Sequence, residues 1–349
     1  MKFGISLTFS NPRETFIPYS RLMESQIAQS VLAEEVGFDH VWVAEHHGSE
    51  HYFPAAMSTL AVLATRTRRV RLGSYIVVMP LYHPILIAEQ AAIVDLLSGG
   101  RLELGLGIGN FQDEFEAFGI SRKERGSRME EGLQVIAGLW EQKNFSFSGK
   151  HFNLKNFSLV PRPVQPKAPI WMAGNAPRAI DRAARFGYHL AGSGTGFDLY
   201  DQKLREHGRD PGQFNKSMIV CMLLAKTREE AWRRAGPAML NFLSYYKAEF
   251  DRHPDFEMFR KKPGGYFGVD PLPDPRDVES LKKLNFLGSP FIVGTPDDAL
   301  EAFAKVQQLG ITHPVLSQHF GGMDPAYSED TIRLMGQAVI PAYRDRSTG

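Results

Sequence analysis

Short apolar runs alternate along the chain with longer segments whose apolar positions recur every three or four residues. Short runs of this kind are typical of buried strands, whereas the longer spacing indicates amphipathic helices. In the segment Tyr19–Val36, for example, Met23, Ile27 and Val31 fall on one stripe, and Gly37 follows where a helix commonly ends. The pattern therefore predicts a chain in which strands and helices take turns.

The alternation predicts eight strands connected by helices. The predicted strands are Lys2–Phe9, His40–Ala44, Val70–Met79, Arg101–Gly107, Pro169–Ala173, Tyr188–Ala191, Ser217–Ala225 and His313–Ser317. The predicted helices are Tyr19–Val36, Pro54–Thr67, Pro84–Leu97, a helix that Ser127 and Glu130 begin with a capping box, Pro177–Phe186, Phe197–Glu206, Arg228–Phe250, Thr295–Leu309 and Ser328–Ile340. Eight strand–helix pairs favour one (β/α)8 barrel with insertions, and a doubly wound sheet is the main alternative.

Two segments depart from the rhythm. Phe145–Leu159 is predicted to be a hairpin, and residues 251–290 form an irregular stretch rich in proline, glycine and aromatic residues. A long irregular stretch within a compact domain is typical of a functional lid or a mobile segment. We expect residues 1–349 to form a single barrel domain, with 251–290 as an insertion or lid within it.

Composition narrows the class of protein. Lys and Arg number 40 against 39 Asp and Glu, so the net charge of +1 predicts no general attraction to nucleic acid or anionic lipid. A single cysteine excludes an internal disulfide framework and a multi-cysteine metal site. We find no signal peptide and no apolar run of membrane-spanning length, and we expect a cytoplasmic protein.

The first candidate for chemistry lies at the end of the second predicted strand. Glu45, His46 and His47 are followed closely by Glu50 and His51. In a barrel the carboxyl ends of the strands carry the active site, and histidine is the side chain best suited to proton transfer near neutral pH. The cluster therefore indicates a catalytic site, and structural histidines are the alternative.

The same residues allow a zinc interpretation. His47, Glu50 and His51 match the H-x-x-E-H signature of some zinc peptidases, which requires both histidines on one face of a helix. Gly48 disfavours a helix there, and Pro54 is better placed to begin one. A zinc hydrolase is the weaker hypothesis.

Other strand ends carry glycines and a candidate anion site. The fourth strand ends in Gly105-Leu106-Gly107-Ile108-Gly109-Asn110, which allows close approach of a ligand to the backbone or simply tight packing. The sequence Gly174-Asn175-Ala176-Pro177 precedes a helix, whose N-terminus offers free N–H groups to a phosphate. Arg128, at the start of another helix, can pair with phosphate. These features indicate a phosphate-bearing ligand over the barrel mouth.

The chain resembles the bacterial luciferase-type flavin-dependent monooxygenases over nearly its whole length. Segments that match this family occur in the family's order. They are residues 33–39 (AEEVGFD), 41–47 (VWVAEHH), 83–84 (HP) with 88–90 (AEQ), 97–102 (LSGGRL), 169–174 (PIWMAG), 293–298 (VGTPDD) and 319–323 (HFGGM).

The resemblance implies a (β/α)8 barrel that uses reduced FMN supplied by a separate flavin reductase. In such enzymes reduced flavin and O2 form a C4a-hydroperoxyflavin, which inserts one oxygen atom into an organic substrate and releases water. For this chain it implies a small, largely apolar substrate and a homo-oligomer, most often a homodimer. A non-catalytic flavin-binding protein is also known in the family, but the complete pair His46 and His47 argues against that role.

The resemblance also assigns roles to residues. His46 would be the catalytic acid or base near the flavin, and Glu45 would line the same wall. A non-proline cis peptide that often faces the isoalloxazine would fall at Tyr75–Ile76. The residues expected around the flavin and its phosphate are Gly107, Asn110, Arg128, Gly174, Asn175, Ala176 and Ala179.

Two positions depart from the family's pattern. Many relatives carry a phosphate-binding arginine where this chain has Ile108, and a hydroxyl residue where it has Ala176. Both departures remove groups that hold the FMN phosphate. An oxidoreductase that uses F420 or FMN without oxygen insertion is therefore the alternative function.

Overall fold

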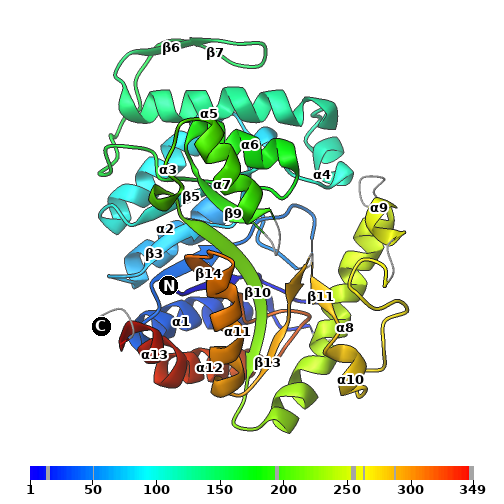
Figure 1. Cartoon of the computed structure of the whole chain (residues 1–349). Helices are drawn as coiled ribbons and strands as arrows, with labels where there is room; N and C mark the ends of the chain where they lie inside the picture. Colours follow the sequence, from blue (N-terminus) through cyan, green and yellow to red (C-terminus); the bar gives the residue numbers. More distant parts are fainter. Residues whose placement is uncertain are drawn as a thin grey trace.

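The computed structural model describes residues 1–12, 16–49, 51–192, 196–252, 257–261, 264–286 and 288–345. Within them, parallel strands follow one another around a closed barrel, and helices cover its outside (Figure 1). In barrel order the strands are β1 (Gly4–Leu7), β2 (His40–Val43), β3 (Arg71–Ser74), β5 (Leu102–Gly107), β8 (Ile170–Ala173), β9 (His189–Gly192), β10 (Lys216–Leu224) and β14 (His313–Ser317).

The barrel closes at its first strand. Gly4 of β1 lies opposite His40 of β2 on one side and opposite Val315 of β14 on the other. This confirms the predicted (β/α)8 fold, because a doubly wound sheet would leave two open edges. The helices around it are α1 (Tyr19–Val36), α2 (Ala56–Arg66), α3 (Pro84–Ser98), α5 (Arg125–Glu141), α6 (Pro177–Phe186), α7 (Phe197–Glu206), α11 (Pro296–Gln308) and α12 (Pro325–Leu334).

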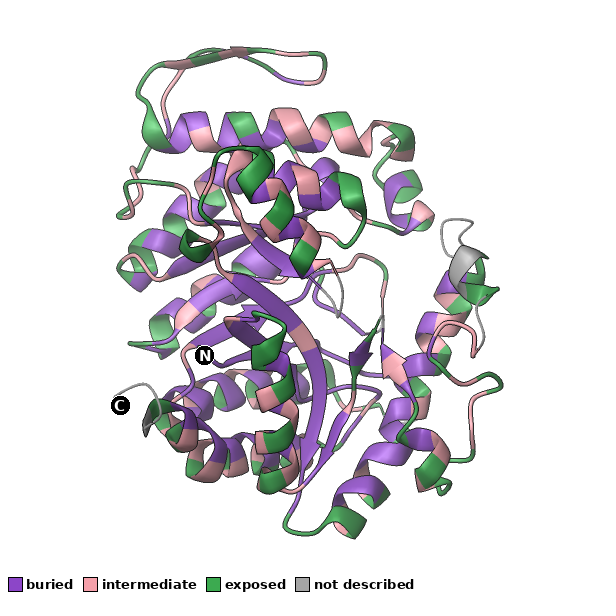
Figure 2. Cartoon of the chain, in the orientation of Figure 1, coloured by how far each residue is buried: buried purple, intermediate pink, exposed green. Residues whose placement is uncertain are grey.

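The barrel strands are almost entirely buried (Figure 2). Their alternate residues belong to two different apolar layers. Ile5 and Val41 belong to the main core between strands and helices, whereas Trp42, Trp171 and Val315 form a separate cluster. Because successive strand residues point to opposite faces, the second group fills the inside of the barrel. The inside of the barrel is thus a packed core and not an open channel.

The third predicted strand is interrupted. β3 pairs with both β2 and β5, but β4 (Val77–Val78) pairs with β5 alone, and a short 3-10 turn η2 (Met79–Leu81) follows. The break falls at Tyr75–Ile76, where the peptide bond is cis. The continuous strand Val70–Met79 was therefore wrong at its carboxyl end, whereas the position of the cis peptide is confirmed.

The predicted capping box is wrong. α5 begins at Arg125 directly after the 3-10 turn η3 (Arg122–Glu124), so Ser127 already lies inside the first helical turn. Its hydroxyl donates to the Glu124 carbonyl instead. The last predicted helix also begins earlier, at Pro325 in α12, and continues through a π-helical segment η6 (Met335–Val339) into α13 (Ile340–Asp345).

Smaller insertions enlarge the barrel at three places. A short helix α4 (Gln112–Ala117), which periodicity missed, precedes α5, and a 3-10 turn η4 (Pro211–Gln213) precedes β10. The predicted hairpin is confirmed as β6 (Phe145–Ser148) and β7 (Asn153–Phe157), which extend beyond α5 (Figure 1).

The largest insertion follows β10. It contains α8 (Arg228–Arg252), α9 (Glu257–Arg260), α10 (Val278–Leu281), β11 (Asn285–Phe286), β12 (Ser289–Pro290) and β13 (Ile292–Gly294). Its aromatic residues Phe242, Phe267 and Phe286 are buried in a second apolar cluster together with Phe320. Residues 251–290, predicted to be irregular, thus include short elements that pack against α8.

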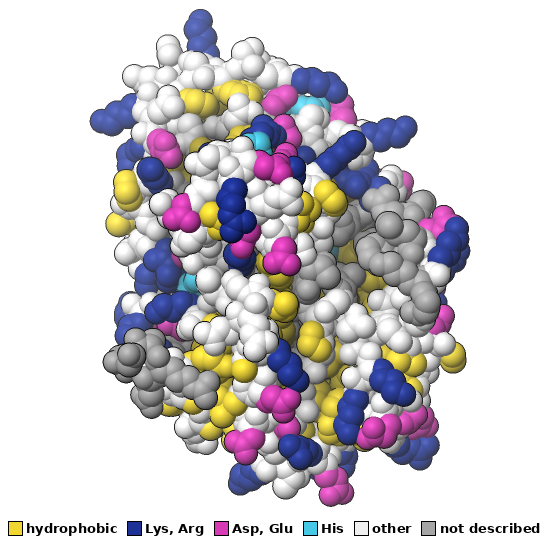
Figure 3. Space-filling view, in the orientation of Figure 1, with side chains coloured by type: hydrophobic (Ala, Val, Ile, Leu, Met, Phe, Trp, Pro, Cys, Tyr) yellow, Lys and Arg dark blue, Asp and Glu magenta, His cyan; other side chains and the backbone are white. Residues whose placement is uncertain are grey.

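The outer surface carries charges of both signs. Figure 3 shows acidic and basic side chains interspersed over the face it presents, in keeping with the nearly neutral composition. In the part of the chain that the structure describes, no helix is long and apolar enough to cross a lipid bilayer.

A buried carboxylate fixes the connection between α2 and β3. Glu34, near the end of α1, accepts the backbone N–H groups of Arg68, Arg69 and Val70. Burial alone would raise the pKa of Glu34, but these backbone hydrogen bonds outweigh it and hold that pKa below its ordinary value. The ionised carboxylate therefore stabilises the folded state.

We predict that Glu34→Gln lowers the free energy of unfolding by about 1–3 kcal/mol at neutral pH, because buried donors lose a charged acceptor. The native pKa is depressed, so this contribution is complete above the unfolded-state pKa of about 4.3 and is lost as the pH falls through the lower native value. Urea unfolding measured from neutral to acidic pH should show the gap between wild type and variant closing below about pH 4. The exposed neighbour provides a control, since Glu35→Gln should leave stability unchanged throughout; a constant gap for Glu34→Gln would contradict the prediction.

Candidate functional site

The site residues predicted from the second strand lie at the carboxyl end of the barrel. The chain leaves β2 at Ala44, and His46 donates its backbone N–H to the Phe53 carbonyl at 3.1 Å, while Glu45 forms a parallel bridge with Phe53. Residues 44–49 and 51–53 therefore return on themselves, and we call them the histidine loop. This loop places Glu45, His46 and His47 beside one another.

His46 is held by an acidic residue that the sequence did not single out. Its Nδ1 lies 3.0 Å from Oε1 of Glu114 in α4, and the same oxygen accepts the backbone N–H of His47 at 2.9 Å. The ring packs between Tyr52 and Phe111, with centroid separations of 4.6 and 4.9 Å. With Nδ1 engaged, Nε2 is the ring nitrogen that remains for proton exchange with a ligand.

The charge of Glu114 is stabilised in a buried position. Burial alone would raise its pKa, but the hydrogen bonds from His46 and from the His47 amide lower it below the ordinary glutamate value. The second oxygen, Oε2, is buried and has no hydrogen-bond partner among the described residues. A buried carboxylate oxygen with this unused capacity suits a site in which a bound molecule supplies a donor.

Glu45 has a different surrounding from the one expected. Its side chain is buried, Oε1 accepts the backbone N–H of Val78 at 3.1 Å, and Oε2 accepts that of Ala56 at 3.3 Å. Both oxygens are thus used to tie the end of β2 to β4 and to the start of α2. The structure gives Glu45 an anchoring position, and its predicted part in catalysis stays a prediction.

His47 lies beside a cavity of about 310 Å³. Its Nε2 is 3.1 Å from the Tyr82 hydroxyl and 3.6 Å from Oε1 of Glu45. Burial and the adjacent Glu45 raise the pKa of Tyr82 above its usual range, so the phenol stays protonated. The residues that line the cavity are Glu45, His47, Pro54, Ala55, Ala56, Met57, Ser58, Val77, Tyr82, Ile87, Gln90 and Phe118.

The zinc interpretation requires a helix, and the described residues of this segment do not form one. Gly48 has a left-handed φ of 66°, and neither residues 47–49 nor His51 are helical. His51 turns its Nδ1 to Ser10 at 2.9 Å, whereas His47 faces Tyr82 and Glu45. Glu50 lies outside the described residues, and no group of three potential ligands is assembled among those described.

Three further strand ends meet next to the cis peptide. A Cβ built on Gly107 would lie 2.6 Å from Cδ1 of Ile76 and 3.4 Å from Cβ of Ala173, so a side chain at position 107 would require Ile76 to move. The Tyr75 hydroxyl donates to the Gly192 carbonyl at 3.2 Å and accepts from Ser217 at 3.2 Å. The structure therefore brings Tyr75, Ile76 and Gly107 together at the mouth.

The expected phosphate-binding residues surround the N-terminus of α6. Gly174 has a positive φ, and a side chain there would collide with Ala179. Asn175 lies near Gly192, since its Oδ1 is 3.6 Å from the position of a Cβ on that glycine. α6 begins with Pro177 at N1, and its N-cap residue Ala176 provides no side-chain acceptor.

Arg128 and Asn110 belong to other elements, Arg128 to α5 and Asn110 to the segment after β5. Arg128 donates Nε to the Pro80 carbonyl at 2.8 Å and stacks over Phe152 at 5.1 Å. α5 is joined to α6 by Arg182, which lies 3.1 Å from Glu130. Asn110 is exposed, and its carbonyl accepts from Arg122 at 3.0 Å. No contact links Arg128 directly to the other predicted phosphate residues among those described, so their common role stays a prediction.

The large insertion covers the histidine loop. Tyr245 of α8 is 2.9 Å from the Ser49 hydroxyl, and its ring lies 4.0 Å from that of His51. The hydroxyls of Tyr52 and Tyr246 are also hydrogen-bonded to each other. These contacts were missed by sequence reasoning because nothing in the pattern of α8 indicates which of its tyrosines face the loop.

The geometry defines a (β/α)8 barrel that carries a cavity beside Glu45 and His47 and a histidine–glutamate pair at the carboxyl ends of its strands. Residues 1–313 match the family model described as luciferase-like monooxygenase, and the chain belongs to this family. This confirms the resemblance inferred from the sequence.

Individual relatives differ in cofactor and reaction. The chain is 34% identical over 333 residues to an F420-dependent glucose-6-phosphate dehydrogenase from Kineococcus radiotolerans, covering 88% of this chain and 91% of that protein. It is 32% identical over 174 residues to the oxygenase component of a flavin-dependent trigonelline monooxygenase from Acinetobacter baylyi, covering 49% of this chain and 48% of that protein.

Among solved structures, monooxygenase RslO1 from Streptomyces bottropensis superposes with a TM-score of 0.82 at 27% identity, covering 98% of this chain and all of that one. The oxygenating constituent of 3,6-diketocamphane monooxygenase from Pseudomonas putida, in complex with FMN, superposes with a TM-score of 0.78 at 21% identity, covering 98% of both chains, and shows the shared fold. The chain is therefore similar to flavin- and F420-dependent oxidoreductases alike.

Proposed function

We propose that the protein is a flavin-dependent monooxygenase that uses reduced FMN and O2 to oxygenate a small, largely apolar organic substrate. The observation that carries the proposal is the ring of His46, held at Nδ1 by a buried carboxylate and flanked by aromatic rings at the barrel mouth. The full-length similarity to monooxygenase RslO1 supports it. Reduced FMN, when bound, supplies the two electrons that O2 needs to give one oxygen atom to the substrate and one to water.

The residues at the mouth fit a flavin in shape and in donor chemistry. Gly107 and Gly174 leave the backbone open where side chains would collide with Ile76 and Ala179. The N-terminus of α6 offers the Arg178 N–H to a phosphate, since Pro177 has no N–H and that of Ala179 donates to the Ala176 carbonyl, and Arg128 offers a cation. These groups suit the phosphate end of FMN.

In this proposal His46 is the acid or base of the reaction. Glu114 fixes the orientation of the ring through Nδ1, so that Nε2 can take up or release a proton next to the reacting atoms. Glu114 is therefore a positioning residue. Glu45 keeps the loop in place through Val78 and Ala56.

We further propose that residues 1–349 form one barrel domain and that residues 251–290, with α8, limit the access of water to the mouth. Phe267 and Phe286 are buried against α8, and α8 itself contacts the histidine loop through Tyr245 and Tyr246. An aromatic cover of this kind favours apolar substrates and protects oxygen chemistry from water.

The second candidate is an F420- or FMN-dependent oxidoreductase that transfers hydride without inserting oxygen. Ile108 is apolar and packs against the main core where many relatives carry a phosphate-binding arginine, and Ala176 lacks a hydroxyl. The 34% identity to an F420-dependent dehydrogenase supports this alternative.

Isotope incorporation separates the two functions. With reduced FMN supplied by a flavin reductase, we expect ¹⁸O2 to place one labelled atom in the product of a compound from a panel of small apolar ketones and aromatics. His46→Asn should lower kcat/KM for this reaction by about 10²–10⁴-fold, because proton transfer is lost.

A matched control uses the exposed His207, where His207→Gln should retain full activity. Oxygenation that persists at the wild-type rate in His46→Asn would contradict the assigned role. Oxygen-independent turnover with reduced F420, without label in the product, would replace the monooxygenase proposal with the hydride-transfer alternative.

Arg128→Ala should weaken FMN binding about tenfold or more, because a charge-assisted hydrogen bond to phosphate contributes about 1.5–3 kcal/mol. Riboflavin lacks the phosphate, so its dissociation constant should not change. Fluorescence titration of both flavins measures the difference, and Lys155→Ala on the exposed hairpin is the control variant. An equal loss for FMN and riboflavin would show that Arg128 does not bind the phosphate.

We also propose that the protein is a homodimer and that helices α2 and α3 form the surface that contacts the second copy. Val62, Leu86, Ile93 and Leu97 are exposed on these two adjacent helices. Sedimentation velocity should show a dimer that Ile93→Lys converts to a monomer, because a charge in an apolar interface is costly. Leu309→Lys, at an equally exposed leucine elsewhere, should stay dimeric; a dimeric Ile93→Lys would exclude this interface.

A further inference from the structure

Three oxidisable aromatic rings form a continuous edge-to-face series inside the barrel. The Tyr75 ring lies 5.6 Å from that of Trp42, and Trp42 lies 5.5 Å from Trp171, both measured between ring centroids, and each pair is nearly perpendicular. Both tryptophans are about 1% exposed, whereas Tyr75 is half-buried at the mouth. The series therefore leads from the mouth of the barrel to its interior. Ring-to-ring contact of this kind allows an electron to move in short steps.

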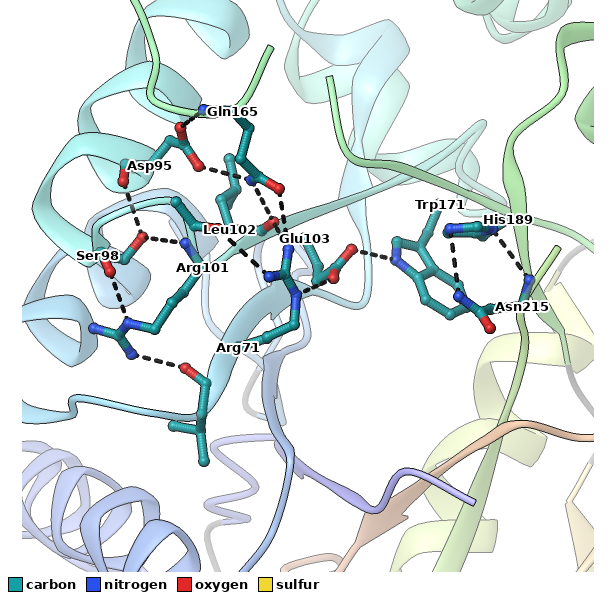
Figure 4. A network of polar contacts seen from close by, with 12 residues as sticks. Arg71, Asp95, Ser98, Arg101, Leu102, Glu103, Gln165, Trp171, His189 and Asn215 are labelled. Carbon is teal, nitrogen blue, oxygen red and sulfur yellow. Dashed lines mark hydrogen bonds and ion pairs between the residues drawn. The ribbon is translucent and has the colours of Figure 1, made fainter. Parts of the chain in front are cut away.

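The three rings differ in what happens to their acidic proton. The Trp42 indole N–H is buried without a hydrogen-bond partner among the described residues. The Tyr75 hydroxyl donates to the Gly192 carbonyl, which is not a base. Trp171, in contrast, donates Nε1–H to Oε2 of Glu103 at 2.7 Å (Figure 4). One-electron oxidation makes the indole N–H far more acidic than in the neutral ring, so Trp171 alone of the three can pass its proton to a carboxylate.

The surroundings of Trp171 favour this transfer. Burial raises the pKa of Glu103 despite its ion pair with Arg71, so the carboxylate is a better proton acceptor than an exposed one. The imidazoles of His189 and His313 pack at 4.8 and 5.1 Å from the indole. Burial lowers the pKa of His189 to about 4 and that of His313 to about 3, so both rings are uncharged at neutral pH.

A polar network holds Glu103 in position. Arg71 also donates to Gln165 at 3.1 Å, and Gln165 donates to Asp95 at 2.7 Å (Figure 4). Because Arg71 is about one-third exposed, this network reaches from the buried carboxylate toward solvent at the amino end of the barrel. When Glu103 gains or loses its charge, Arg71 and the solvent at the amino end of the barrel can compensate for the change.

We propose that Tyr75, Trp42 and Trp171 form a one-electron relay through the barrel, with Glu103 as the acceptor of the Trp171 indole proton. The relay rests on the proposed function only for the identity of its oxidant, a flavin-type cofactor or a reactive species at the mouth. Its role is to reduce an oxidant that forms at the mouth when no substrate is present to react with it.

The step balances in electrons and protons. One electron leaves Trp171 by way of Trp42 and Tyr75 and reduces the one-electron oxidant at the mouth. The Nε1–H bond of Trp171 breaks, its proton bonds to Oε2 of Glu103, and a neutral indolyl radical and a neutral carboxyl group result. A soluble one-electron reductant of the ascorbate or thiol class then returns the electron, and the proton returns from Glu103.

Flash photolysis tests the relay with two photo-oxidants, FMN and a soluble ruthenium tris(bipyridyl) complex with an irreversible quencher. In the wild type, we expect a long-lived neutral tryptophanyl radical in the transient absorption spectrum. Trp171→Phe should lose this signal. Glu103→Gln, which keeps a hydrogen-bond acceptor but removes the base, should give only the short-lived protonated radical.

Trp140→Phe is the matched control. Trp140 is equally buried, but it donates to the Gln165 carbonyl and does not belong to the series of Tyr75, Trp42 and Trp171. It should keep the wild-type signal. Circular dichroism and thermal unfolding verify that each variant is folded, and Glu103→Gln decides the matter if Trp171→Phe does not fold.

Wild-type yield and lifetime in Trp171→Phe, or in Glu103→Gln, would overturn the relay. The ruthenium arm needs no bound flavin, so it decides the relay independently of FMN. A separate titration that shows no FMN binding would instead count against the proposed function.

Discussion

The carboxylate of Glu114 is the contact on which the geometry of the site depends. One of its oxygens accepts both the His46 ring and the His47 amide, so a single group sets the ring and the backbone of the histidine loop. Glu45 does the same one residue earlier, for the amides of Val78 and Ala56. Irregular backbone at the end of a barrel strand has no ladder partner for its N–H groups, and buried N–H groups need acceptors. Two carboxylates supply them and thereby align β2, β4, α2 and α4.

The same solution recurs away from the mouth. Asp95 in α3 accepts the amides of Val164 and Gln165, and Glu131 in α5 accepts those of Lys150, His151 and Phe152 at the hairpin turn. A carboxylate has enough lone pairs to accept several donors at once, and charge strengthens each bond. Long connections can therefore be ordered without regular structure of their own. The site is one instance of a general way in which this fold attaches its loops.

The sequence predicts those parts of the structure that have a local signal, such as apolar periodicity, and misses those that depend on residues distant in the chain. Strands and helices around the barrel carry apolar periodicity, so their order follows from it, and the number of strand–helix pairs favours the closed barrel over a doubly wound sheet. Glu114 has no such signal, because α4 is a single short acidic turn whose importance arises only from what lies opposite. The capping motif at Ser127 fails for a related reason. Serine and glutamate at this spacing also fit inside a first turn, and only the preceding turn η3 decides where α5 begins.

Trp42 requires glycine at two positions that are distant from it in the sequence. The indole lies directly over the backbone of Gly4 and Gly73 on the neighbouring strands, and a Cβ at either position would collide with it. The ring fills the barrel only because both neighbours lack side chains. In evolutionary terms the three positions are expected to covary: a lineage that keeps a large ring at 42 keeps glycine at 4 and 73, and one that gains side chains there must first accept a smaller residue at 42.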